Sequence, residues 1–238
     1  MAPVAPKRLE GRKVAAAACF DSFGKVAMTL LAACRREGAE TTLHLLELNN
    51  RALSRRQRLE IRRIDPRTPI EKHNWSDLHN LCSPMAGDVD ALILGLDGRR
   101  SREALLQLQG AWGLGQPRPR LISAYPGILF RFALEGMLDR SGADLLCLNS
   151  QQDLSIYQKG CAAMGLDSSN AVVTGLPILW RTHPRTDLPE HPSIVFFEQP
   201  SIPVHPLQRR FICEQLRDLS AAWPNHSVIF KPRTSSIE

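Results

Sequence analysis

Short apolar runs alternate with segments of helical pattern along most of the chain, and this alternation constrains the fold more strongly than any other feature of the sequence. The apolar runs, which predict buried strands, are 13–19, 41–48, 89–96, 120–124, 143–148 and 171–174. Apolar residues recur at helical spacing in 25–37, 101–112 and 151–164. Strands that alternate with helices are typical of a parallel sheet with crossover connections, so the sequence predicts an α/β, Rossmann-like fold.

A change of composition at residues 181–192 divides the chain. This stretch is rich in proline, histidine and charged residues and has no periodicity, as is typical of an interdomain linker. Beyond it, a strand–helix–strand pattern at 193–197, 206–223 and 228–231 predicts the start of a second Rossmann-like domain. The expected parts are a disordered N-terminal tail (1–12), a first Rossmann-like domain (13–180), the linker (181–192) and an incomplete second domain (193–238). In the alternative arrangement, the final strands extend the first sheet.

Residues 49–87 show the weakest pattern, because they are polar, rich in arginine and interrupted by prolines. A helix over 75–82, capped by Asn74 or Ser76, is the one element expected here. The arginines that gather in this region are Arg51, Arg55, Arg56, Arg58, Arg62 and Arg63. No aromatic residues are interleaved with them, so we expect no nucleic-acid partner even though the formal net charge is +6. Peripheral contact with an anionic membrane surface is the alternative use of this cluster.

Spacing argues against several other classes of protein. The six cysteines form no CxxC pair and do not cluster with histidine, which predicts reduced thiols and no zinc finger. His183, His191 and His205 lie beside prolines and fit no metal site, and Gly24 is not part of a GxGxxG fingerprint, so we expect no metal and no cofactor. The sequence contains neither a signal peptide nor an apolar run of membrane-spanning length. We therefore expect a cytoplasmic location, either free or peripheral to the inner face of the membrane. The sequence does not define the oligomeric state.

Several short motifs resemble those of a bacterial family of GT-B-type glycosyltransferases of poorly defined function. They are Phe20-Asp21-Ser22-Phe23-Gly24-Lys25, Ser123-Ala124-Tyr125-Pro126-Gly127, Ala143-Asp144-Leu145-Leu146-Cys147-Leu148-Asn149-Ser150, Thr174-Gly175-Leu176-Pro177 and Val228-Ile229-Phe230-Lys231-Pro232-Arg233. A fainter similarity leads to bacterial sialyl- and polysialyltransferases. The resemblance implies transfer of a sugar from a nucleotide-activated donor, bound mainly by the second domain, to an envelope or capsule glycan bound by the first. It also implies that no metal is required, since GT-B enzymes usually hold donor phosphates with side chains and helix dipoles.

Two acidic residues follow predicted strands, at the edge where open α/β sheets bind ligands. Asp21 follows the first strand and could act as a general base on an acceptor hydroxyl. In the alternative, Asp21 or Ser22 only caps the helix that follows. Asp97 follows the strand at 89–96 and is the second catalytic candidate, while the alternative for Asp97-Gly98 is a simple turn.

The other candidate residues are assigned to the two substrates. Ser22, Lys25 and Tyr125 are expected on the acceptor side, with Tyr125 exposing a ring on which a sugar can stack. On the donor side, the candidates are Lys231 and Arg233, whose cations suit nucleotide phosphates, and Thr174 and Gly175, whose backbone amides could hold phosphate oxygens. The plainer alternatives are solvated cations, a turn at Tyr125 and a strand terminator at Thr174.

Two further functions fit the same sequence. One is a non-catalytic module that binds a phosphorylated ligand or nucleotide sugar without turnover. The other is an inactive glycosyltransferase fragment that retains only the acceptor side. Binding of nucleotides with or without turnover separates these hypotheses from the enzyme.

Overall fold

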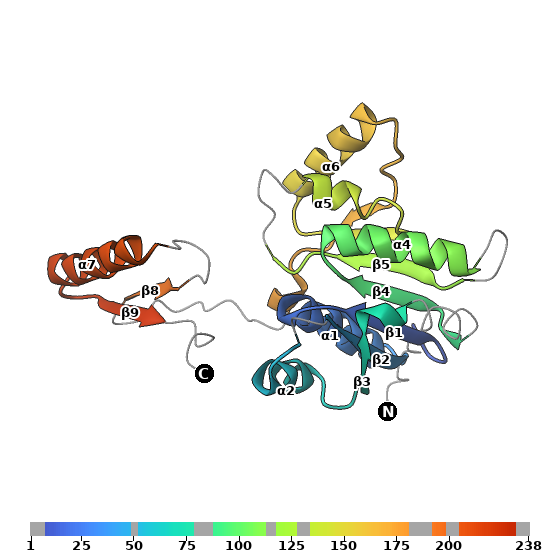
Figure 1. Cartoon of the computed structure of the whole chain (residues 1–238), viewed down its shortest axis with the longest axis horizontal. Helices are drawn as coiled ribbons and strands as arrows, with labels where there is room; N and C mark the ends of the chain where they lie inside the picture. The colour runs from blue at the N-terminus through green and yellow to red at the C-terminus, as the bar shows by residue number, and fades with distance from the viewer. Residues whose placement is uncertain are drawn as a thin grey trace, which may run out of the picture. The chain divides into compact units, whose positions relative to one another are not determined.

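A seven-stranded, all-parallel sheet in the order β3-β2-β1-β4-β5-β6-β7 forms the first part of the structure (Figure 1). This computed structural model describes residues 8–48, 52–78, 88–112, 118–127, 134–180, 192–198 and 205–231. The strands are β1 (Lys13–Ala18), β2 (Glu40–Glu47), β3 (Ile70–Asn74), β4 (Ala91–Gly95), β5 (Arg120–Ala124), β6 (Leu145–Leu148) and β7 (Ala171–Val173). The α/β, Rossmann-like fold expected from the sequence is confirmed.

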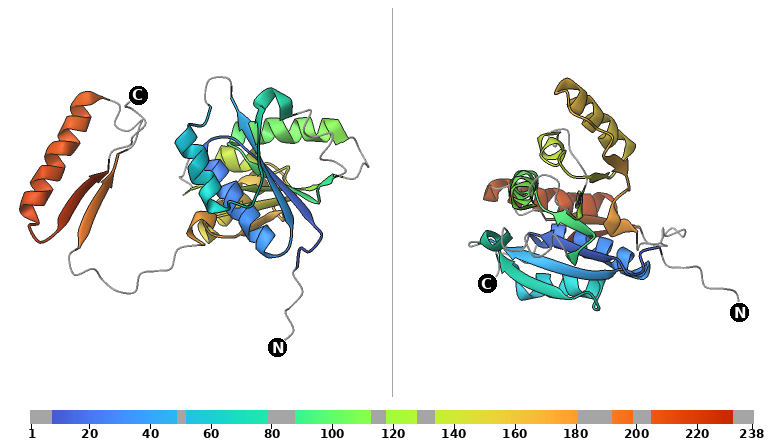
Figure 2. Two further views of the ribbon diagram at one scale, coloured as in Figure 1. Left: turned by 90° about the horizontal axis from the view of Figure 1, so that it is seen from below. Right: turned by 90° about the vertical axis from the view of Figure 1, so that its right-hand side faces the viewer.

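Helices cover both faces of this sheet (Figures 1 and 2). One face carries α1 (Asp21–Arg36) and α2 (Arg55–Ile64), and the other carries α4 (Gly98–Trp112), α5 (Leu134–Leu138) and α6 (Gln151–Ala163). Within β4, Leu92 and Leu94 pack in the cluster that includes Leu108 of α4, whereas Ile93 packs in the cluster that includes Leu31 of α1. Burial on both faces explains why the central strands have continuous apolar sequences.

Small residues at the centre of the sheet allow the layers to approach closely. The alanines of β1, Ala15 to Ala18, are all buried. A Cβ atom on Gly95 of β4 would lie 2.9 Å from the Cβ of Ala18 and 3.2 Å from the carbonyl oxygen of Phe23. A Cβ atom on Gly24 of α1 would lie 2.7 Å from the Cδ1 of Ile61 in α2. These glycines therefore determine how closely β4 packs on α1 and how closely α1 packs on α2.

Several elements differ from the sequence-based expectation. Residues 49–87 contain α2 and β3, neither of which the hydrophobic pattern predicted. The helix expected over 75–82 begins as a short 3-10 turn, η1 (Trp75–Asp77), and residues 79–82 lie outside the described residues. The helix expected over 101–112 begins earlier, at Gly98, so Ser101 is fully buried inside α4, and its hydroxyl donates to the carbonyl of Leu96 at 3.3 Å.

The beginning of the described chain is attached to the sheet. Residues 8–12, part of the expected tail, form a turn in which the Leu9 amide donates to the Glu37 carbonyl at 2.9 Å. Next to it, the Arg12 guanidinium lies 2.7 Å from a carboxylate oxygen of Asp90. The Leu9 side chain packs against the cluster between the sheet and α1.

A second compact unit comprises His183–Glu238, while the first comprises Met1–Thr182. Its described elements are β8 (Ser193–Phe197), α7 (Pro206–Ala222) and β9 (Ser227–Lys231). β8 and β9 pair in parallel in a two-stranded sheet of their own, so the alternative in which they extend the first sheet is wrong. None of the described helices is long and apolar enough to cross a membrane.

Candidate functional site

The strand order reverses direction between β1 and β4, and this topological switch point is where open α/β sheets open a crevice for ligands at the carboxyl ends of their strands. β1 is followed by Cys19, Phe20 and Asp21, and β4 is followed by Leu96 and Asp97. The Cys19 amide donates to the Gly95 carbonyl at 3.1 Å, so the two strand ends are joined beyond the regular ladder. Both acidic residues singled out in the sequence thus lie at the same place in the fold.

Phe20 connects β1 to α1 in an unfavourable backbone conformation. Its φ is 63°, and it is the one non-glycine residue with positive φ in the part of the chain that the structure describes. Such a conformation costs about 1–3 kcal/mol and persists only where the surroundings impose it. The Phe20 side chain packs against the core cluster beneath α4, and the Arg100 guanidinium lies 5.1 Å from its ring centroid. The strained turn therefore places the first residues of α1 at the edge of the sheet.

Asp21 is the first residue of α1 rather than its cap, because Phe20 occupies the N-cap position. The capping alternative for Asp21 and for the exposed Ser22 is therefore wrong. The Oδ2 of Asp21 accepts a hydrogen bond from Lys25 Nζ at 2.9 Å. Its Oδ1 is buried and has no hydrogen-bond partner among the described residues. A buried carboxylate oxygen without a donor is unfavourable, so this atom is suited to accept a proton or a hydrogen bond from a ligand.

Lys25 is held between two carboxylates. Besides Asp21, its Nζ lies 2.7 Å from Oε2 of Glu60 on α2. Partial burial opposes its charge, but the hydrogen bonds to Glu60 and Asp21 outweigh this and raise the pKa of Lys25 above its ordinary value. Lys25 is therefore a fixed cation that orients Asp21. The alternative, a solvated lysine, does not describe this environment.

Asp97 occupies the position directly before α4 and is bound by Arg100. Its Oδ1 accepts from the Arg100 amide at 3.1 Å, and its Oδ2 is paired with the Arg100 guanidinium. The first contact is that of a helix cap, in which a carboxylate satisfies an amide of the first helical turn. Because Arg100 also lies over the Phe20 ring, a single side chain connects the two strand ends at the switch point.

Cys19 lies between these two tips and is buried. Burial raises the pKa of its thiol to about 12, with Arg100 lowering it slightly and Asp97 raising it. The thiol is therefore protonated at neutral pH and is no nucleophile, as expected of a buried structural cysteine.

Tyr125 does not expose its ring, and the expectation of a sugar-stacking surface there is wrong. The residue is only 6% exposed, and its hydroxyl accepts a hydrogen bond from Arg140 at 3.2 Å. The Arg140 guanidinium lies 4.3 Å from the ring centroid. Burial raises the pKa of Tyr125 to about 12, even though Arg140 opposes the shift. Arg140, which the sequence did not single out, thus organises the tip of β5 from the interior.

The donor-side candidates are divided between the two units. Thr174 follows β7, and its amide donates to the Leu148 carbonyl at 2.9 Å, so that amide continues the sheet. Gly175 has a φ of 73°, which glycine adopts readily. Lys231 is the last residue of β9 in the second unit, where its Nζ lies 5.6 Å from the ring centroid of Phe197. Arg233 lies outside the described residues.

The first unit therefore brings Asp21, Lys25 and Asp97 to one switch point, with Ser22 exposed beside them. The residues that sequence reasoning missed there are Phe20, Glu60, Arg100 and Arg140. Of these, Arg100 could have been found, because it follows Asp97 by three residues, the spacing of an ion pair within one helical turn. Glu60 and Arg140 come from elements whose packing depends on the tertiary fold.

A doubly wound parallel sheet with a switch point defines a Rossmann-like protein, and its fold matches those of GT-B-type structures. The protein belongs to the family described as "Putative glycosyltransferase (DUF6716)", which matches residues 14–238. The comparison with curated proteins finds no match for the chain.

Several solved structures share the fold. A Listeria monocytogenes protein described as "putative UDP-N-acetylglucosamine 2-epimerase" has a TM-score of 0.63 at 16% identity, over 94% of this chain and 63% of its own. LpCGTa, solved in complex with UDP, has a TM-score of 0.57 at 12% identity, over 92% of this chain and 70% of its own. The lipopolysaccharide outer core galactosyltransferase WaaB has a TM-score of 0.52 at 9% identity, over 94% of this chain and 69% of its own. The chain thus spans less than two thirds of the Listeria protein, and at these identities the likeness concerns the fold alone.

Proposed function

We propose that the protein transfers a sugar from a nucleotide-activated donor to a hydroxyl of an envelope or capsule glycan. The proposal is supported by membership of the glycosyltransferase family and by the fold shared with LpCGTa, whose structure contains UDP. The observation that carries it is the buried Oδ1 of Asp21, which lacks a donor among the described residues and lies at the switch point of the sheet. The proposed location is the cytoplasm, at or near the inner face of the membrane where such glycans are built.

In the proposed reaction, Asp21 is the general base. Its free oxygen accepts the proton of the acceptor hydroxyl, while the oxygen of that hydroxyl forms a bond to the anomeric carbon of the donor sugar. The bond between that carbon and the phosphate oxygen breaks, and the electron pair leaves with the nucleoside diphosphate. The ion pair with Lys25 fixes the other oxygen of the carboxylate in position.

The other residues have supporting roles in this proposal. Ser22 is exposed next to Asp21 and contacts the acceptor. Asp97 is the second carboxylate of the site, held in place by Arg100. On the donor side, the proposed phosphate ligands of the second unit are Lys231 and Arg233, whose cations stand in for a metal ion. The Thr174-Gly175 turn of the first unit is a separate candidate for binding phosphate oxygens.

The decisive experiment measures release of nucleoside diphosphate from a panel of nucleotide sugars by the purified protein, with and without glycan acceptors. We expect Asp21→Asn to lower turnover by about 100-fold or more, the usual contribution of a general base. Because the Asp21 side chain is partly exposed, the variant should keep its fold and its nucleotide binding, measured as a ligand-induced increase in Tm. Asp218→Asn, the same change at an exposed position of α7, is the matched control and should be fully active.

Two outcomes would contradict the proposal in different ways. Full turnover by Asp21→Asn would show that Asp21 is not the general base, although the protein would still be an enzyme. Nucleotide binding without turnover by the wild-type protein would favour the non-catalytic binding module instead.

A further inference from the structure

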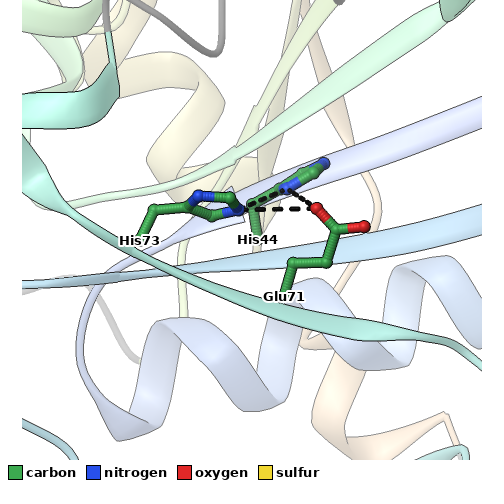
Figure 3. Close-up of side chains that lie close together, drawn as sticks. All are labelled: His44, Glu71 and His73. Atoms are coloured by element: carbon green, nitrogen blue, oxygen red, sulfur yellow. Dashed lines mark hydrogen bonds and ion pairs between the residues drawn. The ribbon is translucent and has the colours of Figure 1, made fainter.

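Three potential metal ligands converge on one side of the sheet, away from the switch-point residues described above. Figure 3 shows the side chains of His44, Glu71 and His73 pointing toward one another from β2 and β3. The Nδ1 of His44 lies 3.2 Å from the Nε2 of His73 and 3.3 Å from the Oε2 of Glu71. The Nε2 of His73 lies 3.5 Å from the same Glu71 oxygen. Each residue therefore contributes one ligand atom to a compact triangle.

The strand register produces this arrangement. Glu71 and His73 are two residues apart on β3, so their side chains point to the same face of the sheet. In the parallel pairing of β2 with β3, His44 is the partner of Glu71. His44 is also the partner of Ala17 in β1, whose side chain belongs to the core cluster beneath α4. The three side chains thus lie on the α4 side of the sheet, at its β3 edge.

The size of the triangle fits a transition-metal ion. A tetrahedral zinc ion has ligand atoms at about 2.0–2.1 Å, so neighbouring ligand atoms are separated by roughly 3.3–3.4 Å. The three observed separations of 3.2, 3.3 and 3.5 Å lie close to this value. An ion placed just above the plane of the three atoms can therefore contact all of them without movement of the strands.

Hydrogen bonding alone does not satisfy the cluster. An ionised carboxylate accepts only, and each of the two ring nitrogens either donates or accepts. If both nitrogens donate, the contact between His44 and His73 brings two donors together. If either nitrogen accepts, its contact with the Glu71 oxygen brings two acceptors together. Every tautomer leaves at least one unfavourable contact, whereas a cation is attracted by all three lone pairs at once.

The surroundings also suit a metal ion with one open position. His44 is only 8% exposed, His73 is partly buried and Glu71 is exposed, so the site is anchored in the sheet and open to solvent on one side. Two imidazoles and one carboxylate favour zinc and similar divalent ions over magnesium and calcium, which prefer oxygen ligands.

We propose that His44, Glu71 and His73 bind a divalent transition-metal ion, zinc in the first instance, with a water molecule as the fourth ligand. The ion would fasten the edge strand β3 to β2 through three side chains. This inference does not depend on the proposed sugar transfer, for which no metal is invoked.

The test uses the purified protein, freed of metal with a chelator and then titrated with zinc chloride by isothermal titration calorimetry. We expect one zinc ion per chain and no comparable binding of magnesium. Addition of cobalt(II) to the same metal-free protein should give the strong visible absorption bands typical of four-coordinate cobalt. Zinc should also raise the Tm, because it binds only the folded arrangement of the three ligands.

Two variants at accessible positions test the ligand set. His73→Ala and Glu71→Gln should each weaken zinc binding by more than about 100-fold, since loss of a mere outer-shell partner already costs about 10- to 100-fold. Both residues lie on the edge strand outside the core, so circular dichroism should show an unchanged fold. Lys72→Ala, between them on the opposite face of β3, and His226→Ala, in the second unit, are matched controls that should retain wild-type affinity.

Three outcomes would overturn the proposal. The first is a wild-type protein that does not bind zinc at micromolar concentration. The second is zinc binding of unchanged strength in both ligand variants. The third is binding that is lost in His226→Ala but kept in His73→Ala, which would indicate adventitious coordination by a surface histidine.

Discussion

Each half of the sheet, on either side of the switch point, contains an arginine with several hydrogen bonds. The two halves differ in which charged group is buried. In the β3-β2-β1 half, Arg35 of α1 donates to both oxygens of Asp65, with Nε–Oδ2 and Nη2–Oδ1 distances of 2.6 and 2.7 Å. Asp65 is 2% exposed, while the Arg35 side chain is 29% exposed. In the β4 to β7 half, Arg140 is itself 2% exposed. One half thus buries the anion and the other buries the cation.

The two arginines also differ in their partners. Among the described residues, the hydrogen-bond acceptors of Arg140 are uncharged: the carbonyls of Leu96 and Gly136 and the hydroxyl of Tyr125. Burial lowers the pKa of Arg140, only partly offset by Tyr125, whereas the bond to Asp65 raises the pKa of Arg35. Since Leu96 directly precedes Asp97, the buried cation supports the strand tip of the candidate site. A charge paired with a carboxylate thus fixes the edge of the sheet, whereas a charge with neutral hydrogen-bond acceptors, and with Asp97 and Asp139 only nearby, fixes the loop beside the site.

The largest effect is expected for Arg140→Ala. This change leaves a cavity and deprives the Leu96 and Gly136 carbonyls and the Tyr125 hydroxyl of their donor. Unsatisfied buried acceptors together with a cavity should lower the free energy of unfolding by about 3–5 kcal/mol. Urea unfolding followed by circular dichroism measures this loss. A loss below about 1 kcal/mol would show that Arg140 is no more important to its half than an ordinary surface residue.

A smaller and pH-dependent effect is expected for Asp65→Asn. Burial opposes ionisation of Asp65, but hydrogen bonds from Arg35, Thr68 and the Arg67 amide outweigh it and hold its pKa below the ordinary value of 3.8. A carboxyl group with a depressed folded-state pKa stabilises the fold fully above its ordinary pKa and loses this contribution as the pH falls through the folded-state pKa. At pH 7 the variant should be about 2–3 kcal/mol less stable than the wild type.

The sign of the pH dependence is the critical part of this prediction. Other carboxylates with lowered pKa, such as Asp144, also weaken the wild-type protein in acid. The relevant quantity is therefore the difference in unfolding free energy between wild type and Asp65→Asn, measured at pH 7 and again near pH 3. That difference should shrink in acid. A difference that grows as the pH falls would mean that the ion pair between Arg35 and Asp65 does not stabilise the β3-β2-β1 half of the sheet.

The smallest effect concerns Gly95, where the two halves meet. An added Cβ would lie 2.9 Å from the Cβ of Ala18, so Gly95→Ala should push β4 away from β1 and α1 and lower stability by about 1–2 kcal/mol. Gly110→Ala is the matched control, because nothing lies within 4 Å of an added Cβ there and the position is inside α4. That change should raise stability by about 0.5–1 kcal/mol. Equal effects of the two substitutions, measured by thermal unfolding, would argue against close packing at the junction.

The sequence predicted elements that have an apolar run or a helical apolar stripe, and it missed α2 and β3, which have neither. The bounds expected for β5 and β8, 120–124 and 193–197, agree with the structure. In α2, by contrast, Ile61 is the one buried residue, and arginines occupy much of the remaining surface, so no helical apolar stripe could be recognised. β3 is an edge strand whose side chains are partly or fully exposed, so it has no apolar run at all.

The candidate site was predictable only where it depends on strand ends. Asp21 and Asp97 could be placed together because parallel strands end at a common edge. The burial of Tyr125 could not, since it depends on Arg140, which approaches from a turn after α5. The His44–Glu71–His73 cluster depends on the register between β2 and an unrecognised β3, so sequence reasoning considered only His183, His191 and His205 as metal ligands.

The protonated thiol at the end of β1 has a practical consequence. Alkylating reagents attack thiolates, and burial keeps Cys19 in the unreactive form with a pKa of about 12. Among the described cysteines, Cys213 on α7 is the exposed one, whereas Cys19, Cys147 and Cys161 are buried. Of these described cysteines, Cys213 on α7 should therefore be the first to react with a maleimide fluorophore. Cys213 thus provides a site for a spectroscopic label on the second unit that requires no mutation near the strand tips.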